Sequence, residues 1–449
     1  MRKSVLTLAL TAGLAWGASA QAQQLETIYE SLHRPMTYQE CVERSVFFDS
    51  NVGRQKVDSA QRRLAYDTAR SLYLPKVQAS IKEDWEYGRS QDNTGAFGPR
   101  SSANTTFDLS ASYELFSGLR RPRMVKAARL DEQNSDAMLA TLRERAELRV
   151  MGFFYKYLLE QNIIKAIQQH LSGLEELQER AMLLVKEGKY PSCRLDELAT
   201  LIETERGFLY EAESQCAMTR VDLSVCVEYY GEAPIQLVAP DLPVLVRNAR
   251  AELLPPEAIY RHALAHRPDL KAADLGIAAA EEKIRSARSG YIPSLSINAG
   301  YGNGYFRVLQ QANKSFGDQL RENGRFYVGF SISLPIFDAL NTAHAVRRAK
   351  IDLHSAQLDK IDADLGLYKD IFKAHANAVT AERKISSTTL AVGAAERASQ
   401  FARKQFIEGK ASAYELERAE ERWILAQREA LAAQYDFIYK AGVLALYGR

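Results

Sequence analysis

The stretch ARSLYLP at residues 69–75 recurs as ARSGYIP at residues 287–293, with five of the seven positions identical. The tripeptide EGK at residues 187–189 is likewise repeated at residues 408–410, at almost the same offset. Matches that keep one spacing across a long segment indicate an internal duplication. The sequence therefore predicts two copies of one structural unit.

Both halves follow the same predicted plan: a helix, two strands, a very long helix, a glycine-containing turn and a last helix. A proline-rich segment between them predicts an irregular connector. The expected divisions are a signal peptide at 1–22, a first repeat at 23–231, the connector at 232–256 and a second repeat at 257–449. The expected helices span 37–72, 119–187 and 194–230 in the first repeat, and 257–290, 340–408 and 413–447 in the second.

The N-terminal segment has the pattern of a secretory signal. Arg2 and Lys3 precede the apolar run Val5–Trp16, and Ala18 and Ala20 mark a small-residue cleavage site. No later apolar run approaches the roughly 20 residues that a transmembrane helix needs. We therefore expect an exported protein.

The overall charge is balanced. The chain has 58 lysines and arginines against 56 aspartates and glutamates, which gives a net charge of +2. A nucleic-acid-binding protein normally carries a strongly basic face. Nucleic acid is therefore not an expected partner.

The two long helical segments restrict the architecture. Residues 124–187 and 338–408 contain no proline. Seventy residues of helix measure about 100 Å, which is deeper than the core of a compact globule. Such helices bury an apolar stripe against other long helices, as in coiled coils. The fold class is therefore predicted to be mainly α with a β part.

The strand segments have the period of a membrane barrel. Residues 326–337 alternate strictly between apolar side chains and small or polar ones, and residues 106–115 do the same. Looser alternation at residues 77–87 and 295–305 completes two strands per half, within about 77–116 and 295–337. Each segment has about the length of a tilted membrane-spanning strand. The alternative is a soluble antiparallel sheet with one wet face.

Aromatic side chains cluster near the expected strand ends, as in the girdle of a barrel at the membrane interface. These residues are Trp85, Tyr87, Tyr113, Phe116, Tyr301, Tyr305, Phe326 and Phe337. The polar segments 88–105 and 307–325 would then be the longer extracellular loops.

Four strands are too few to close a barrel. An open sheet in lipid leaves unsatisfied edge groups, so copies of the chain must share their strands. Two copies give eight strands, which leave no wide aqueous lumen, whereas three copies give twelve strands with room for a pore. The expected assembly is a homotrimer.

Three short marks give the chain its resemblance to a known family. They are RPDL at 267–270 before an Ala- and Glu-rich helix, YIP at 291–293 before a strand, and LPIF at 334–337 before a long helix. In this order and within a duplication, the chain resembles the TolC-like outer-membrane efflux proteins over essentially its whole mature length.

The resemblance implies a non-enzymatic exit duct in the cell outer membrane. Three chains would form a 12-stranded β-barrel above a long α-helical barrel that extends into the periplasm. The family serves tripartite efflux or type I secretion systems. The implied partners are a periplasmic adaptor protein, an inner-membrane transporter and outer-membrane lipid.

The resemblance also places the periplasmic tip of the duct at two turns, about 188–192 and 409–412. The implied adaptor contacts are Gly188, Lys189, Gly409, Lys410 and Ser412. Independently of the family, each glycine is expected to end its helix in the left-handed conformation. Ser412 and Glu415 have the spacing of a capping box for the next helix.

The family often narrows its tip with rings of acidic residues just after the second turn. The corresponding positions here are Glu415 and Arg418. Glu415 fits an aperture gate, whereas Arg418 departs from the pattern and puts a double acidic ring in doubt. The two side chains are also spaced for an i,i+3 ion pair.

The sequence shows no pattern of catalytic or cofactor-binding residues. His262 and His266 have i,i+4 spacing without an acidic residue of the HExxH type, so a solvated pair is expected and not a metal site. No P-loop and no supported nucleophile triad is found, so no catalytic residue and no cofactor is predicted. The cysteines have no zinc-like spacing and are expected to be small buried side chains; they are Cys41, Cys193, Cys216 and Cys226.

Two other functions are compatible with parts of the pattern. A periplasmic coiled-coil scaffold or adaptor with a soluble β domain would also have long helices and alternating strands. An exported enzyme is disfavoured by the missing site chemistry. Membrane fractionation separates the channel from the scaffold, because recovery in the soluble periplasm without detergent would exclude the channel.

Overall fold

The computed structural model describes residues 35–91, 97–99, 101–229, 234–309 and 312–449. The predicted signal peptide lies outside these residues. The described chain falls into two compact units, and each takes segments from both sequence repeats. The sheet unit consists of Val57–Ala137 and Lys271–Asp362; the helical unit consists of the described residues up to Lys56, with Met138–Leu270 and Ala363–Arg449.

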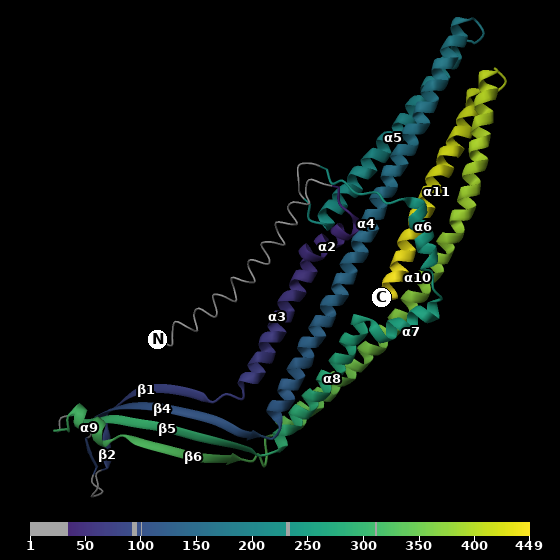
Figure 1. The fold of residues 1–449 in the computed structure, drawn as a ribbon. Coiled ribbons are helices and arrows are strands. Elements are labelled where there is room, and N and C mark those ends of the chain that lie inside the picture. Colours follow the sequence, from purple (N-terminus) through teal and green to yellow (C-terminus); the bar gives the residue numbers. More distant parts are fainter. Residues whose placement is uncertain (1–34, 92–96, 100, 230–233, 310–311) are drawn as a thin grey trace. The chain divides into compact units, whose positions relative to one another are not determined.

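The sheet unit contains one four-stranded antiparallel sheet in the order β1-β4-β5-β6 (Figure 1). Its strands are β1 (Lys76–Glu86), β4 (Ser102–Ser117), β5 (Ser294–Val308) and β6 (Arg325–Ser333). Two strands come from each repeat, so the four predicted strands are confirmed. The central β4–β5 pair joins the two repeats, and β1 and β6 are the edges.

The strand register gives the sheet two different faces. Residues directly opposite each other in an antiparallel pair point to the same face. Phe326 pairs with Tyr301, and Tyr301 pairs with Leu109, which makes an apolar row across three strands. The adjacent rows point to the other face, where Ser331 pairs with Ser296 and Ser296 with Glu114. The predicted alternation is therefore confirmed at the level of pairing.

The apolar face of this sheet is left open by the described chain. Phe330 is 70% exposed and Ile332 is 76% exposed, both on edge strand β6. Ile81 on the opposite edge strand is 74% exposed. Side chains of this kind are normally buried, so an uncovered apolar face indicates a surface that another apolar phase or another chain covers.

The loops at the outer end of the strands contain structure that the sequence did not predict. The loop after β1 holds a short ribbon of β2 (Arg89–Gln91) and β3 (Phe97–Pro99). The loop after β5 holds the helix α9 (Phe316–Glu322), with Ser315 as its N-cap. The Phe316 ring packs edge-on against Tyr305, at 5.1 Å between centroids, which holds α9 beside β5.

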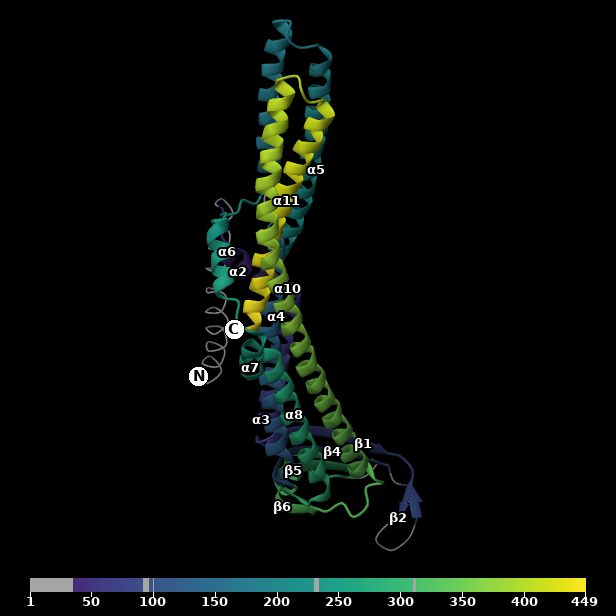
Figure 2. The same cartoon turned by 90° about the vertical axis from the view of Figure 1, so that its right-hand side faces the viewer.

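Two long helices continue from the sheet unit into the helical unit. They are α4 (Arg120–Lys186) and α10 (Asn341–Ile407), and both match the predicted long helices. Each is followed by a returning helix, α5 (Cys193–Cys226) or α11 (Ala413–Tyr447). Figure 2 shows the two resulting helical hairpins side by side in the helical unit.

The helical unit buries apolar side chains in several separate clusters along these hairpins. Phe154 and Leu158 of α4 pack with Leu223 of α5 in one cluster, together with residues of α2 (Tyr38–Phe48). Phe437 of α11 forms a second cluster with Ile385 of α10. These side chains recur at helical spacing, as expected for long helices that bury one stripe.

Several predicted segments differ in detail. The connector is not wholly irregular, because it contains α6 (Leu242–Ala251) with Pro243 in the first turn, where proline needs no hydrogen-bond partner. The predicted helix 257–290 is two helices, α7 (Pro256–His266) and α8 (Pro268–Arg288), since Pro268 restricts Arg267 to an extended conformation. The short 3-10 turn η2 (Ser289–Tyr291) then leads into β5.

The first predicted helix, 37–72, is also divided. It consists of α2 and α3 (Ser50–Ser71), which meet at Asp49. The Asp49 carboxylate accepts hydrogen bonds from the backbone N–H groups of Asn51 and Val52 at 2.7 and 3.1 Å. An aspartate that caps the next helix in this way ends the preceding one.

The expectation of buried cysteines is right for two residues and wrong for a third. Cys41 and Cys216 are buried, and Cys226 is half-buried. Cys193 is exposed at the start of α5. Within the described residues, no helix combines the length and apolarity needed to cross a membrane.

Candidate functional site

The two hairpin turns have the same backbone geometry. Gly188 has a φ of 71° and Gly409 a φ of 73°, so both are left-handed as predicted. The N–H of Gly409 donates to Phe406 at 3.0 Å, and that of Lys410 donates to Gln405 at 2.8 Å. Gly188 and Lys189 repeat this double pattern, which is a Schellman motif. Both long helices therefore end in the same way.

The side chains at these turns are solvated. Lys189 forms an ion pair with Glu187 at 2.7 Å, and Lys410 forms the matching pair with Glu408 at 2.7 Å. All four side chains are exposed. Exposed ion pairs of this kind contribute little to stability. These residues are thus free to serve a surface role.

The second turn has the predicted capping box. Ser412 donates its backbone N–H to Glu415 Oε2 at 2.8 Å, and the Glu415 N–H donates to Ser412 Oγ at 3.3 Å. These hydrogen bonds from Ser412 lower the pKa of the Glu415 carboxyl. The first turn has no equivalent, since Ser192 makes no side-chain cap bond.

Arg418 does not pair with Glu415 in the described chain. Its guanidinium lies 5.6 Å from the centre of the Tyr414 ring, a cation–π contact on the same helix. Glu415 is held by the capping box instead. The predicted i,i+3 ion pair is therefore replaced by two separate local contacts.

Behind the turns, an aromatic clamp joins the two hairpins. The Tyr190 hydroxyl donates to the Phe406 carbonyl, and the two rings meet edge-on at 6.0 Å. Arg194 of α5 donates to the Ala411 carbonyl at 2.5 Å and lies over the Phe406 ring. The clamp was not predicted, because Tyr190 and Phe406 belong to different repeats.

Farther along the hairpins, a buried charge network connects all four helices. Its centre is Glu420 of α11, which is fully buried. Arg403 of α10 donates two hydrogen bonds to this carboxylate at 2.6 and 2.8 Å, and His170 of α4 lies 2.6 Å from its Oε2. Ser399 of α10 donates a further bond at 2.8 Å.

The fourth helix contributes a second carboxylate. Glu205 of α5 lies 3.1 Å from His170 Nδ1, without the geometry of a hydrogen bond. The network has no net charge when His170 is protonated, because two carboxylates then face two cations, His170 and Arg403. A neutral imidazole would leave one buried negative charge without compensation, which is costly.

The local sequence provides room for this network. A Cβ at position 173 of α4 would lie 2.9 Å from Arg403 Nη1, so Gly173 allows the guanidinium to reach Glu420. Trp423 packs against both cations, with its ring 5.6 Å from Arg403 and 5.5 Å from the His170 ring. Gly173 is one of only two glycines in α4.

The protonation of the network follows from its contacts. Burial alone would lower the pKa of His170, but the carboxylates of Glu205 and Glu420 outweigh it and raise that pKa above its usual value. Burial alone would raise the pKa of Glu420, but Arg403, His170 and Ser399 outweigh it and lower that pKa to about 2. The charged forms of both groups are therefore favoured.

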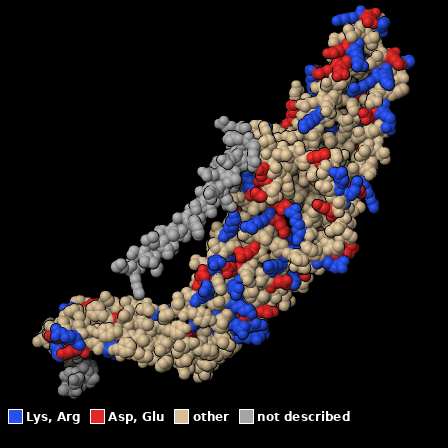
Figure 3. All heavy atoms as spheres, in the orientation of Figure 1, with Lys and Arg blue, Asp and Glu red and all other residues tan. Residues whose placement is uncertain are grey.

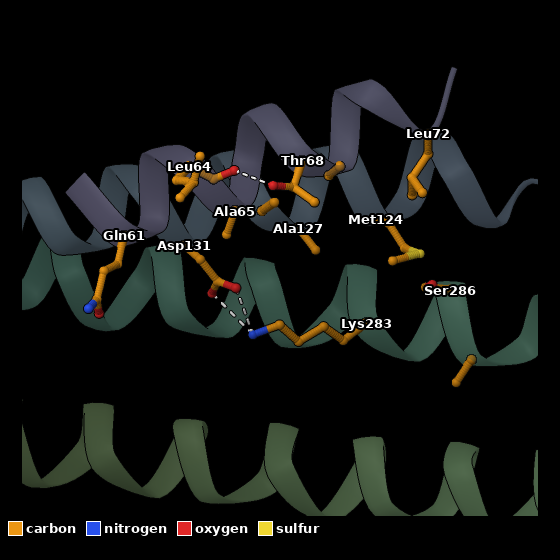
Figure 4. A pocket seen from close by; sticks show the side chains of 13 residues that line it. Gln61, Leu64, Ala65, Thr68, Leu72, Met124, Ala127, Asp131, Lys283 and Ser286 are labelled. Atoms are coloured by element: carbon orange, nitrogen blue, oxygen red, sulfur yellow. Dashed lines mark hydrogen bonds and ion pairs between the residues drawn. The ribbon is translucent and has the colours of Figure 1, made fainter. Parts of the chain in front are cut away.

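The sheet unit has an apolar groove of about 810 Å³ between α3, α4 and α8 (Figure 4). Leu64, Leu72 and Met124 line it, and one ion pair crosses it, from Lys283 to Asp131 at 2.9 Å. Leu64 is exposed. An uncovered groove on long helices is a surface suited to another helix.

Two weaker sequence features have simple explanations. His262 and His266 are exposed and stack on each other at 4.2 Å, as a solvated pair does. Gly300 lies under the Tyr327 ring of the neighbouring strand, where a Cβ would come within 2.6 Å. Glycine at this position permits close packing of the two neighbouring strands.

Comparison with known proteins finds a family match in the second half of the chain. Residues 259–444 match the outer membrane efflux protein family. The chain carries an outer membrane efflux protein domain. This confirms the resemblance found in the sequence and the predicted localisation in the outer membrane. The residues in and just after the second turn all lie within the matched segment, namely Gly409, Lys410, Ser412, Glu415 and Arg418.

A curated protein also matches part of the chain. The outer membrane protein TolC of Vibrio cholerae is 25% identical over 183 residues. The match spans 40% of this chain and 41% of the length of that relative.

Solved outer-membrane channels share the fold of this chain. CusC superposes with a TM-score of 0.74 at 16% identity, covering 92% of both chains. VceC of Vibrio cholerae gives 0.71 at 15% identity, covering 92% of this chain and 96% of that one. The open state of MtrE of Neisseria gonorrhoeae gives 0.68 at 19% identity, covering 92% and 89%. The predicted fold class is thereby confirmed.

The buried network makes hairpin packing depend on pH. Because the folded-state pKa of His170 is raised, its contribution is complete below its ordinary value of 6.5 and is lost as the pH rises through the raised value. The Glu420 contribution is present above its ordinary value of 4.5 and is lost as the pH falls toward about 2. Both groups therefore contribute their full stabilisation between the ordinary pKa of glutamate, 4.5, and that of histidine, 6.5.

We predict that His170→Gln destabilises the packing of the two hairpins by about 3–5 kcal/mol, since it leaves one buried negative charge uncompensated. Amide hydrogen exchange of α4 and α11 between pH 5 and pH 9 measures the effect, and the difference from wild type should shrink toward high pH. His354→Gln on the exposed surface of α10 is the control. An equal difference at every pH would contradict the protonated histidine.

Proposed function

We propose that this chain forms the outer-membrane exit duct of a tripartite efflux or type I secretion system, as a homotrimer and without enzymatic activity. The observation that carries this proposal is the four-stranded sheet with two free edges and an uncovered apolar face. An exposed apolar face of this kind is stable against lipid. The backbone groups at the two edges are hydrogen-bonded only when the sheet closes into a barrel.

The polar face of the sheet supports a water-filled lumen. Ser110, Ser112 and Asn298 lie on this face, where Ser112 pairs with Asn298 across β4 and β5. In a closed barrel with lipid outside, the opposite face lines the interior. Small and polar side chains leave room for water and passing solutes.

The helices support association of copies. α10 carries exposed apolar side chains at Ile351, Leu358 and Leu365, one every seven residues, with Ile361 between them. This heptad spacing is that of a coiled-coil seam. The groove beside α3 is apolar and uncovered, so we propose that the α10 seam of a neighbouring copy covers it.

We further propose that the tip turns face a periplasmic adaptor protein, which connects the duct to an inner-membrane transporter. The solvated residues Gly188, Lys189, Gly409, Lys410 and Ser412 would form this contact, and Glu415 and Arg418 would lie near the aperture. Support comes from the exposure of the turns and from their matching geometry.

The rival function is a periplasmic scaffold with a soluble sheet. Such a protein would keep its apolar face covered, whereas the face here is open in the described chain. Membrane fractionation distinguishes the two. Recovery of the mature protein from the periplasm without detergent would exclude the duct.

The strand count predicts the assembly. Because each chain has four barrel strands, the mass of the purified protein in detergent should equal three chains. Native mass spectrometry or light scattering provides the measurement. A monomer or dimer that still conducts ions in planar bilayers would refute the shared barrel.

Replacement of Gly409 should impair export more than folding. Gly409→Ala strains a left-handed position by about 1 kcal/mol, which a large trimer tolerates, but it changes the turn that the adaptor meets. Export from cells and trimer yield are measured together. Gly366→Ala in the interior of α10 is the control, because it is helical and faces open space. Equal losses of export and yield would indicate a purely structural turn.

Glu415 can be tested by separating its charge from its cap. Glu415→Gln retains the capping box and removes the charge, whereas Glu415→Ala removes both. If three Glu415 carboxylates surround the axis, both variants should change the conductance or its cation dependence in planar bilayers. Unchanged conductance with loss of helix stability only in the alanine variant would leave Glu415 as a capping residue.

A further inference from the structure

The sheet and the helices of the sheet unit meet at a compact junction. Arg121 is buried there, with its guanidinium 5.7 Å from the Tyr73 ring and 5.3 Å from the Tyr113 ring. Gly290 packs directly against the Thr342 side chain. All four strands are connected to helices at this same end of the sheet: β1 and β5 begin here, and β4 and β6 end here.

Basic side chains gather around this junction. We name them the basic collar: Lys76, Arg120, Arg123, Lys126, Arg285 and Arg288. All are exposed or half-exposed, and the Lys126 side chain is 58% accessible. In Figure 3 blue side chains concentrate where the sheet meets the helices, while the sheet itself shows few charged atoms until its outer end.

The acidic residues at this level do not balance the collar. The buried Glu282 carboxylate is shared by Arg123, Lys126 and Arg285, at 3.1, 2.9 and 2.7 Å. One carboxylate thus serves three cations, and only Arg285 also reaches Glu281.

The positive charges of the other three collar residues are compensated even less. Arg120 shares Glu114 with the buried Arg121, at 3.5 and 3.1 Å. Lys76 and Arg288 have no acidic partner within the described residues. The collar therefore carries a net positive charge that faces solvent.

Aromatic and apolar side chains lie at the same level. Tyr73, Tyr291 and Phe116 are exposed, and Phe337 is 81% exposed. Amphipathic rings of this kind prefer the boundary between hydrocarbon and water. The collar thus lies where an apolar sheet surface ends and a solvated helix surface begins.

We propose that the basic collar binds the anionic headgroups of bilayer phospholipids at the end of the barrel next to the helices. Guanidinium and ammonium groups bind phosphate oxygens through charge-assisted hydrogen bonds, and cations near an anionic lipid surface are attracted to it. The inference rests on the proposed membrane duct and adds the lipid class that surrounds it.

The neighbouring aromatics favour a lipid surface over another polyanion. A polysaccharide or free phosphate uses the cations alone, whereas a bilayer also covers Tyr73, Tyr291 and the apolar sheet face beside them. The collar therefore fits a lipid whose headgroup carries negative charge and whose chains lie against the sheet.

The test uses the full mature protein in vesicles of equimolar zwitterionic phosphatidylethanolamine and anionic phosphatidylglycerol. After mild detergent extraction, mass spectrometry measures the ratio of the two lipids that remain bound. We expect anionic lipid to be enriched. The triple variant Lys76→Gln, Arg120→Gln, Arg288→Gln should reduce the enrichment at least about fivefold, the effect of about one cation at a headgroup.

This triple variant keeps the buried ion pairs intact, since Glu114 retains Arg121. The matched control removes three exposed cations of α10, away from the collar, with Lys373→Gln, Arg383→Gln and Lys384→Gln. This control variant should keep the wild-type lipid ratio. A bound-lipid ratio equal to that of the vesicles, or equal losses in both triple variants, would overturn the collar.

Two further arms identify the source of the anion. Inorganic phosphate should not displace the bound lipid at an ionic strength matched with chloride, and displacement would indicate a free-phosphate site instead. Binding of isolated peptidoglycan that depends on the collar residues would likewise overturn the lipid proposal. Failure of the protein to enter vesicles of any composition would refute the duct itself, whereas insertion without lipid preference would refute only the collar.

Discussion

An apolar β-face that the described part of the chain does not cover determines much else in this protein. Phe330, Ile332 and Ile81 expose most of their surface, and the edge strands β1 and β6 have unpaired backbone groups on one side. In water both features promote aggregation, whereas in lipid the face is stable once the edges are paired. Because this sheet has four strands, too few to close a barrel, we propose that other copies of the chain pair its edges. In this proposal, insertion of the sheet into the membrane and association of the copies depend on each other.

The helices meet a different requirement. Long helices with small apolar stripes can slide or separate, and the two hairpins of the helical unit are held by specific polar contacts as well as by core packing. Glu420, His170 and Arg403 are buried where only a matching set of charges is tolerated. Buried polar groups of this kind can specify one register of helices, as single polar residues do in coiled coils. The aromatic clamp at Tyr190 and Phe406 holds the same two hairpins nearer to the turns.

Much of this fold was accessible from the sequence, because its signals are local and periodic. The alternation in 326–337 and the long proline-free segments gave β6 and the helices α4 and α10 within a few residues. The sequence pattern does not reveal the helix α6, because prolines usually interrupt helices, whereas Pro243 lies in a first turn where proline is favourable. The capping box at Ser412 was predictable from spacing alone. The charge network was not, since His170 and Glu420 lie 250 residues apart and pair only through the fold.

The division of the chain into units also bears on how it is made. β4 comes from the first repeat and β5 from the second, and Ser102 pairs with Val308 at one end of their ladder. The centre of the sheet therefore cannot form until the chain has been delivered as far as β5, which ends at Val308. During that interval β1 and β4 form a hairpin with an unpaired inner edge and an exposed apolar face, a state prone to wrong pairing. A duplicated chain whose repeats are interleaved in space in this way depends on something that shields its first half while its second half is still being exported.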